Sequence, residues 1–438
     1  MEAQQPRTAE SGLGPVRQSA SMWRFLALPA VAMSLGWGLR GFIGGGPLGA
    51  MIPGAVIGLV LAVLLRQERQ AAWLAACAAA GVGLGGQMTY GQTVGLSLRP
   101  ESFGWAMLGF TVKGGAWGLA GGAVLGAGLI RGRDGWKDGR FLCALAAMVA
   151  ATWAGWRLVN APKLVYFSDP LNRPREEVWA GLLAGAVTFL LCAARGRMKH
   201  LAWRFALWAS AGGALGFPLG AALQAWGRAF SVAPWLDWWK GMEFTFGALL
   251  GLGFGIAAWL SRRELIPGPA VESARSEPLT ASLLLAAAAV AAVVGIDYRL
   301  ELRFNYSVAA ALALAAALRS NLIARHVAMT VTATAFVLDL AENTPALAGA
   351  AGWLAAAAAG AAVAWRVSGR FAPRDMLSLL VWAAVAVSVV KTFAAPGLVS
   401  LGHLLTECMF VLMAWLCIHW VRTEVTNDTE AGPATVAS

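Results

Sequence analysis

Residues 103–130 read FGWAMLGFTVKGGAWGLAGGAVLGAGLI, a long apolar run with one charged side chain, Lys113. A helix needs about 20 apolar residues to cross the hydrocarbon core of a bilayer, so this run is long enough to span it. Similar runs fill the rest of the chain, in which 58% of the 438 residues are hydrophobic and 13% are charged. A soluble domain is nearer a quarter charged. The sequence therefore predicts an all-α, polytopic transmembrane helix bundle.

Polar and charged residues divide the apolar sequence into about fourteen predicted spans. These cover residues 23–39, 47–65, 71–90, 103–130, 141–159, 179–194, 201–226, 241–260, 279–296, 304–318, 327–341, 347–365, 376–394 and 398–421. Every even-numbered connection carries at least two basic residues, and Lys and Arg collect in cytoplasmic loops. We therefore expect both ends of the chain on the cytoplasmic side. This topology accounts for the net charge of +11, and no nucleic-acid partner is expected.

Composition divides the chain into two membrane subdomains. The first, residues 22–260, contains eight predicted spans, 41 of the 52 glycines and 16 of the 21 tryptophans. The second, residues 279–421, contains six predicted spans and is rich in alanine. Between them, residues 261–278 combine prolines with mixed charge and are predicted to be a cytoplasmic linker. The polar ends, 1–21 and 422–438, are predicted to be disordered cytoplasmic tails.

The eight-span subdomain contains a predicted internal repeat. A shift of 127 residues lays the third and fourth spans on the seventh and eighth without a gap. The glycines at 85–86 then fall on those at 212–213, and the Lys-Gly pair at 113–114 falls on the pair at 240–241. Four spans per unit is an even number, so the repeat would be parallel, as in several transporter folds. The alternative is chance matching within sequence rich in glycine and alanine.

Glycines are placed in two informative patterns. Gly114, Gly118, Gly122 and Gly126 recur at every fourth residue, which predicts a helix face that a neighbouring backbone can approach closely. In residues 40–53, by contrast, two prolines and five glycines interrupt the apolar sequence. Broken or re-entrant backbone at membrane depth often frames the binding site of a transporter.

Charged side chains inside spans cost about 2.5–3.5 kcal/mol each on insertion scales, so they are kept in pairs or beside a wet cavity. By the predicted topology, these charges lie toward the outer side. The predicted substrate-binding residues are Arg40, Lys113, Lys240, Gln87, Tyr90 and Trp238. The cations have a second interpretation as anchors that reach the bilayer interface. The polar patch around Gln87 could instead join helices, and Trp238 could belong to the interfacial aromatic belt.

A second set of embedded residues has the chemistry of proton transfer. These are His403 and Glu407, Asp339 and Glu342, and Glu243. The first two pairs have i,i+4 and i,i+3 spacing, so each shares a helix face. Histidine titrates near neutral pH, which suits a proton relay. The alternatives are a hydrogen-bonded interhelical pair for His403 and Glu407, and structural ion pairs for Lys240 with Glu243 and Asp339 with Lys391.

Signatures of soluble enzymes are missing from the sequence. It contains no Walker A loop, no GxSxG and no HExxH, and its four histidines are scattered. We therefore expect no cofactor and no metal. The five cysteines all lie in apolar runs without CxxC spacing, which favours buried, unpaired thiols at Cys77, Cys143, Cys192, Cys408 and Cys417.

Together these features favour an integral-membrane secondary transporter of a small polar or anionic solute over an enzyme. The embedded charges predict one outward-facing polar chamber between the two subdomains, with protons as a candidate coupling ion. Two alternatives stay open: a membrane-embedded glycosyl- or acyltransferase acting on a lipid-linked substrate at the outer face, and a non-catalytic membrane partner subunit. The expected partners are the lipid bilayer and the solute, and a homo-oligomer is compatible with the sequence. Composition and short loops indicate a bacterial inner (cytoplasmic) membrane.

Overall fold

The chain folds into a bundle of α-helices, seen in a computed structural model. The structure describes residues 21–43, 45–88, 90–133, 135–169, 176–193, 196, 198–266, 317–318, 320–367, 372–394 and 399–430. Within these residues every regular element is helical, which confirms the predicted all-α class.

Thirteen α-helices occur in the described part of the chain. They are α1 (Met22–Leu39), α2 (Gly46–Leu64), α3 (Ala71–Gly85), α4 (Gly91–Ser97), α5 (Phe103–Gly128), α6 (Asp138–Gly155), α7 (Trp179–Ala193), α8 (Lys199–Ala229), α9 (Trp238–Leu265), α12 (Asn321–Glu342), α13 (Ala350–Val367), α14 (Pro373–Ala394) and α15 (Leu401–Glu430). Twelve of them coincide with predicted spans, and the short helix α4 was not predicted. The predicted spans at 279–296 and 304–318 lie outside the described residues, apart from 317–318.

Seven of the described helices are long and apolar enough to cross a membrane. These are Met22–Leu39, Asp138–Asn160, Lys199–Ala229, Trp238–Leu265, Asn321–Ala341, Pro373–Ala394 and Leu401–Glu424. This count supports a multi-pass membrane protein, whereas the total of fourteen spans stays a prediction.

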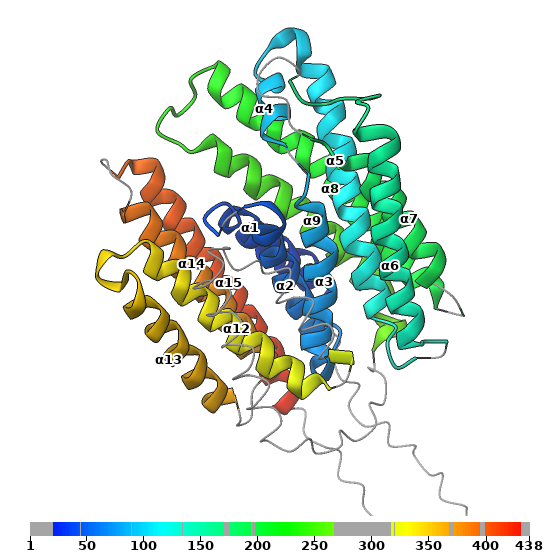
Figure 1. Cartoon of the computed structure of the whole chain (residues 1–438), viewed down its shortest axis with the longest axis vertical. Helices are drawn as coiled ribbons and strands as arrows, with labels where there is room; N and C mark the ends of the chain where they lie inside the picture. Colours follow the sequence, from blue (N-terminus) through cyan, green and yellow to red (C-terminus); the bar gives the residue numbers. More distant parts are fainter. Residues whose placement is uncertain are drawn as a thin grey trace, which may run out of the picture.

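The helices form one packed bundle with α1 and α2 near its centre (Figure 1). On one side α1 packs against α9, α9 against α8, α8 against α5 and α5 against α3, while α6 and α7 form a pair beside α5. On the other side, α14 contacts α2, α15 contacts α1 and α12 contacts α3. The main hydrophobic core contains residues of helices on both sides, so the described parts of the two predicted subdomains are packed against each other.

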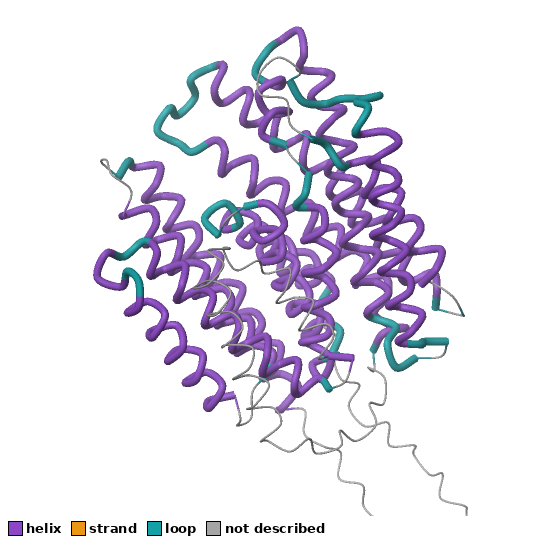
Figure 2. The backbone as a smooth tube through the Cα atoms, viewed as in Figure 1, coloured by secondary structure: helices purple, strands orange, loops and turns teal. Residues whose placement is uncertain are grey.

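The connections lie at two opposite ends of the bundle (Figure 2). Residues 65–70 and 129–137 are at one end, which we call the basic end because it carries Arg66, Arg69, Arg131 and Arg133. Residues 230–237 lie at the opposite end. Two of these arginines also have structural partners: Arg131 donates to Ala317 O (2.6 Å) and Arg133 to Leu265 O (2.7 Å).

The predicted glycine face of α5 packs against α8. A Cβ atom added to Gly114 would meet Gly213, one added to Gly118 would meet Ala209, and one added to Gly126 would meet Ala202. Residue numbers rise along α5 as they fall along α8, so the two helices are antiparallel. Small residues on one face thus let two backbones pass in direct contact, as the i,i+4 pattern predicted.

Gly118→Val is expected to lower the free energy of unfolding by about 3 kcal/mol or more. Its Cβ would overlap the backbone oxygen and carbon of Ala209, and backbone cannot rotate away as a side chain can. Overpacking typically costs about 1–3 kcal/mol, and a backbone clash belongs at the upper end of that range. Thermal unfolding in detergent measures the effect. Gly104→Val is the matched control, because Gly104 lies on the same helix with open space around it. Equal stability of the two variants would contradict the close packing.

The interruption between the first two helices is shorter than the stretch rich in proline and glycine at 40–53. α1 ends at Leu39 and α2 begins at Gly46, so residues 46–53 are helical. The turn requires glycine, because Gly45 (φ 60°) and Gly46 (φ 51°) occupy the left-handed region. Pro53 fits inside α2 because the facing residue, Gly36, has no side chain to meet it.

Several other sequence predictions have mixed outcomes. α9 ends at Leu265 and α15 continues to Glu430, beyond the predicted ends of those spans. Cys143 and Cys408 are exposed on the helix surface, so the expectation that every cysteine is buried was wrong. The internal repeat stays a prediction. It would make α2, α3 and α5 equivalent to α7, α8 and α9. α3 packs against α5 as α8 packs against α9, but the extensive contact of α2 with α3 has no equal between α7 and α8.

Candidate functional site

The candidate site begins at the end of α1, where Arg40 lies over a floor of aromatic rings. Its guanidinium carbon is 5.2 Å from the centroid of Trp37, 5.4 Å from that of Trp117 and 5.1 Å from that of Tyr90. Trp37 and Trp117 meet edge to face at 4.7 Å between ring centroids. Aromatic faces attract a desolvated cation, which allows a charge to be buried here.

Arg40 is buried, and the described part of the chain provides no ion-pair partner for it. The residue is 4% exposed, and its Nη1 donates to Tyr90 Oη at 2.6 Å. Its Nε is buried with no hydrogen-bond partner. Among the described residues, no carboxylate lies within ion-pair distance of this guanidinium. Arg40 therefore holds a positive charge and unused donors in a place shielded from solvent.

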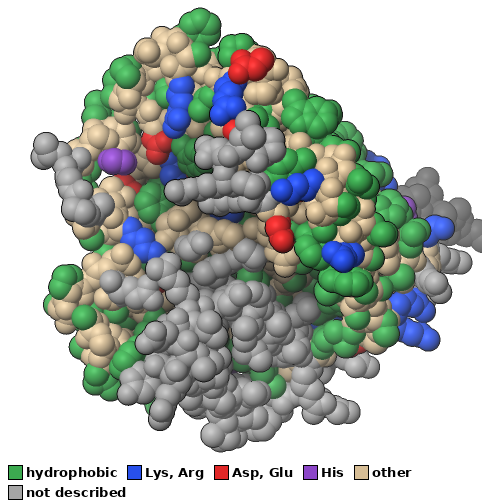
Figure 3. Space-filling model, turned by 45° about the horizontal axis from the view of Figure 1, so that its top comes forward, with side chains coloured by type: hydrophobic (Ala, Val, Ile, Leu, Met, Phe, Trp, Pro, Cys, Tyr) green, Lys and Arg blue, Asp and Glu red, His purple; other side chains and the backbone are tan. Residues whose placement is uncertain are grey.

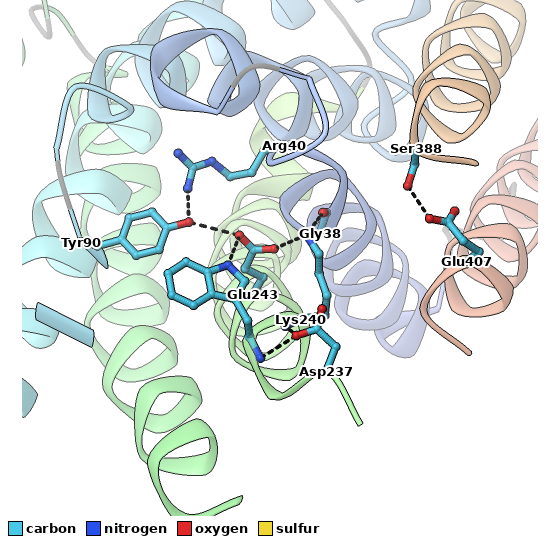
Figure 4. Close-up of polar contacts among 9 residues, drawn as sticks. Gly38, Arg40, Tyr90, Asp237, Lys240, Glu243, Ser388 and Glu407 are labelled. Carbon is cyan, nitrogen blue, oxygen red and sulfur yellow. Dashed lines mark hydrogen bonds and ion pairs between the residues drawn. The ribbon is translucent and has the colours of Figure 1, made fainter. Parts of the chain in front are cut away.

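Tyr90 connects Arg40 to a buried carboxylate, Glu243 (Figure 4). Tyr90 Oη accepts from Arg40 and donates to Glu243 Oε1 at 3.1 Å. Trp239 Nε1 donates to the same oxygen at 3.1 Å, and Lys240 Nζ binds Glu243 Oε2 at 2.7 Å. The ion pair between Lys240 and Glu243, which the sequence left as one of two interpretations, is thus formed. The carboxylate of Glu243, 2% exposed, is fully engaged by three donors.

The start of α9 positions Lys240 and Glu243. Asp237 caps the helix by accepting from the backbone N–H groups of Trp239 (3.0 Å) and Lys240 (3.3 Å), which is the usual role of aspartate at this position. Lys240 and Glu243 then lie one turn apart on the same face. Lys240 Nζ also donates to Gly38 O at 2.8 Å and so ties α9 to the end of α1.

Two of the predicted binding residues do not make polar contacts with Arg40. Trp238 packs its ring on the Gly227 backbone and donates to Val232 O at 2.9 Å, which fixes the connection between α8 and α9. Gln87 is exposed in the turn after α3. Of the predicted substrate-binding residues, the structure joins Arg40, Tyr90 and Lys240 in one hydrogen-bonded chain.

Lys113 lies in a separate, neutralised site. It is 1% exposed, forms an ion pair with Glu177 at 2.6 Å and donates to Thr93 Oγ1 at 2.8 Å. Glu177 in turn accepts from Phe167 N (3.0 Å) and Ser168 Oγ (2.8 Å). The pair therefore fixes the connection between α6 and α7 to the middle of α5.

On the far side of the α1–α2 turn, the predicted ion pair between Asp339 and Lys391 is formed at 2.9 Å. Lys391 Nζ also donates to Phe42 O at 2.5 Å. The end of α1 and the turn after it are thus held from two sides, by Lys240 of α9 at Gly38 and by Lys391 of α14 at Phe42. The side chain of Glu342 lies outside the described residues.

His403 and Glu407 have different surroundings despite their i,i+4 spacing. His403 is exposed, and its Nδ1 lies 3.1 Å from Ser400 Oγ. Glu407 is 6% exposed and accepts at Oε1 from Ser388 Oγ (2.8 Å) and Thr392 Oγ1 (2.7 Å), while its Oε2 is buried without a partner. Figure 4 places this group apart from the Arg40 chain. The two residues are therefore not in contact as a relay in this state.

The end of the bundle opposite the basic end carries mixed charge. Figure 3 shows basic, acidic and histidine side chains interspersed with apolar ones over this face. Among the described residues, no group of three or more His, Cys, Asp or Glu has the arrangement of a metal site.

Sequence reasoning missed the partners that complete these sites. Glu177 is 64 residues from Lys113, and nothing in the sequence marks it among the acidic residues of its loop. Ser388 and Thr392 had a usable signal, because two hydroxyl residues at i,i+4 in an apolar helix share one face. Trp239 was not among the predicted binding residues.

Comparison of the chain with protein-family models, with curated proteins and with solved structures gives no match. The function is therefore argued from the site alone.

Proposed function

We propose that the protein is a secondary transporter of a small anionic solute, and that Arg40 binds the anion. The observation that carries this proposal is the difference between Arg40 and the buried lysines. Lys113, Lys240 and Lys391 each have a carboxylate within 2.6–2.9 Å. Among the described residues, Arg40 has only the Tyr90 hydroxyl and three aromatic rings. A guanidinium with unused donors at a buried position suits a carboxylate or phosphate, which it can bind through two parallel hydrogen bonds.

Tyr90 supplies a route for coupling. Its hydroxyl accepts from Arg40 and donates to Glu243. An anion at Arg40 would compete with Tyr90 for the guanidinium, and this would change the hydrogen bonding of Glu243. Glu243 and Glu407 are the buried carboxylates that we propose as carriers of a coupling ion, because embedded acids commonly form ion pathways.

The proposed orientation follows from charge. The basic end faces the cytoplasm under the positive-inside rule, so both chain ends are cytoplasmic and Arg40 is reached from the outer side. With this orientation we assign the protein to the inner membrane of a bacterium.

Uptake into proteoliposomes tests the proposal. The purified protein is reconstituted and offered labelled inorganic phosphate, mono- and dicarboxylates, sugar phosphates and neutral sugars, under proton, sodium and zero gradients. We expect uptake of at least one anion, faster under a gradient, and no uptake of neutral sugars. Failure of every anion to move, or equal uptake of neutral sugars, would overturn the proposal.

A further inference from the structure

A groove between α7 and α8 lies on the outside of the bundle at the basic end. Its volume is about 610 Å³, and it is lined by Leu190, Leu191, Lys199, His200, Trp203, Arg204, Leu207 and Trp208. α8 begins at the basic end because it runs antiparallel to α5, whose last turn packs against Ala202. The groove therefore starts at the membrane surface and continues toward the bilayer interior.

The lining changes character along the groove. Lys199, His200 and Arg204 lie in the first two turns of α8, at the membrane surface. Deeper along the same helix lie Trp208 and Leu207, which is 56% exposed. Across the groove, Leu191 is 62% exposed and lies in the last turn of α7, close to the basic end. Exposed leucines are suited to contact with lipid chains, and tryptophans are enriched at the level of lipid headgroups.

The surface end of the groove is basic. Glu264 on α9 lies 2.9 Å from Arg204 Nη1 and 2.5 Å from His200 Nε2. This single carboxylate offsets one of the two permanent cations, and no ion pair of Lys199 is found among the described residues. The N-terminus of α8 adds partial positive charge through the helix dipole. An anion would therefore be attracted to the surface end of the groove, and an apolar chain would fit the end nearer the bilayer interior.

We propose that this groove is a binding site for an anionic phospholipid. The headgroup phosphate binds Lys199 and Arg204, and one acyl chain lies along Leu191 and Leu207 between α7 and α8. Basic pockets between transmembrane helices on the cytoplasmic side bind such headgroups. The site is separate from the Arg40 chain, so it holds whether or not the protein transports an anion.

The test compares phosphatidylglycerol with phosphatidylcholine, two lipids that differ in headgroup charge. Full-length protein is mixed with each lipid in detergent, and both the number of lipids retained in native mass spectrometry and the shift in melting temperature are measured. We expect the unchanged protein to retain phosphatidylglycerol preferentially. Lys199→Gln, which breaks no described contact, should weaken that preference about fivefold, and Lys199→Gln with Arg204→Gln should abolish it, since each cation near the surface contributes comparably.

Arg228→Gln is the matched control. Arg228 is an exposed cation on the same helix at the opposite end, so its loss should leave the preference unchanged. An equal loss in this variant would mean that net charge alone attracts the lipid, and the proposal would be wrong. It would also be wrong if soluble glycerol phosphate displaced phosphatidylglycerol completely, because the groove would then bind a free phosphate. Comparing the difference between the two lipids removes any effect of Arg204 on folding.

Discussion

Replacing Arg40 by Met is expected to abolish uptake of the anionic solute while leaving the protein folded. Loss of one partner of a buried, hydrogen-bonded charge pair costs about 2–5 kcal/mol of binding, which corresponds to a loss of about 30-fold to 5,000-fold. Folding should change by only about 1 kcal/mol, because Arg40 has no carboxylate to leave behind and its lost cation–π contacts are offset by a smaller desolvation cost. The loss of transport is measured as uptake and binding of one anion, the member of the panel that the unchanged protein carries fastest. The change in folding is measured by thermal unfolding.

Two further variants make the Arg40 prediction specific. Arg40→Lys keeps the charge but loses the planar fork of donors, so it should retain an intermediate level of uptake. Lys240→Met leaves Glu243 buried beside fewer donors and should lower stability by about 3–5 kcal/mol. If Arg40→Met unfolds the protein as readily as Lys240→Met, then Arg40 is a structural residue and the assignment of the anion site is wrong.

Glu177→Ala is expected to lower the free energy of unfolding by about 3–5 kcal/mol. The change leaves the ammonium of Lys113, which is 1% exposed, without its counter-ion. It also removes the acceptor for Phe167 N and Ser168 Oγ, so the connection between α6 and α7 loses its attachment to α5. The melting temperature in detergent should fall, and limited proteolysis should cut this connection faster than in the unchanged protein.

Glu176, the neighbour of Glu177 in the sequence, provides the control. Glu176 is exposed, so Glu176→Ala should change stability by less than about 0.5 kcal/mol. Lys113→Met combined with Glu177→Leu should recover most of the lost stability, because an apolar pair replaces a buried ion pair at little cost. The unchanged protein, Lys113→Met, Glu177→Leu and the double variant form a double-mutant cycle that isolates the interaction. Equal behaviour of Glu176→Ala and Glu177→Ala would show that the ion pair is not formed.

The candidate site was predictable only where helix periodicity or membrane depth decided the geometry. Lys240 and Glu243 pair because residues three apart share a helix face, whatever the helix packs against. Asp339 and Lys391 are distant in sequence but were expected at the same depth, and they do meet. His403 and Glu407 show the limit of such reasoning: their spacing puts them near each other, yet one side chain turns outward to Ser400 and the other is held by hydroxyls of α14.

The sequence by itself determined that this is an all-helical protein with several membrane-crossing segments, which residues of α5 form its close-packed face, and that Lys240 and Glu243 share one helix face. Each of these follows from hydropathy or from the 3.6-residue period, which are properties of one segment. The tertiary structure alone decided that α8 is the partner of the glycine face, that Glu177 neutralises Lys113, and that Arg40 has aromatic rings but no carboxylate beside it. The physical reason is that a buried charge is balanced by whatever the packed helices bring within a few ångströms, and spacing along the chain carries no record of that distance.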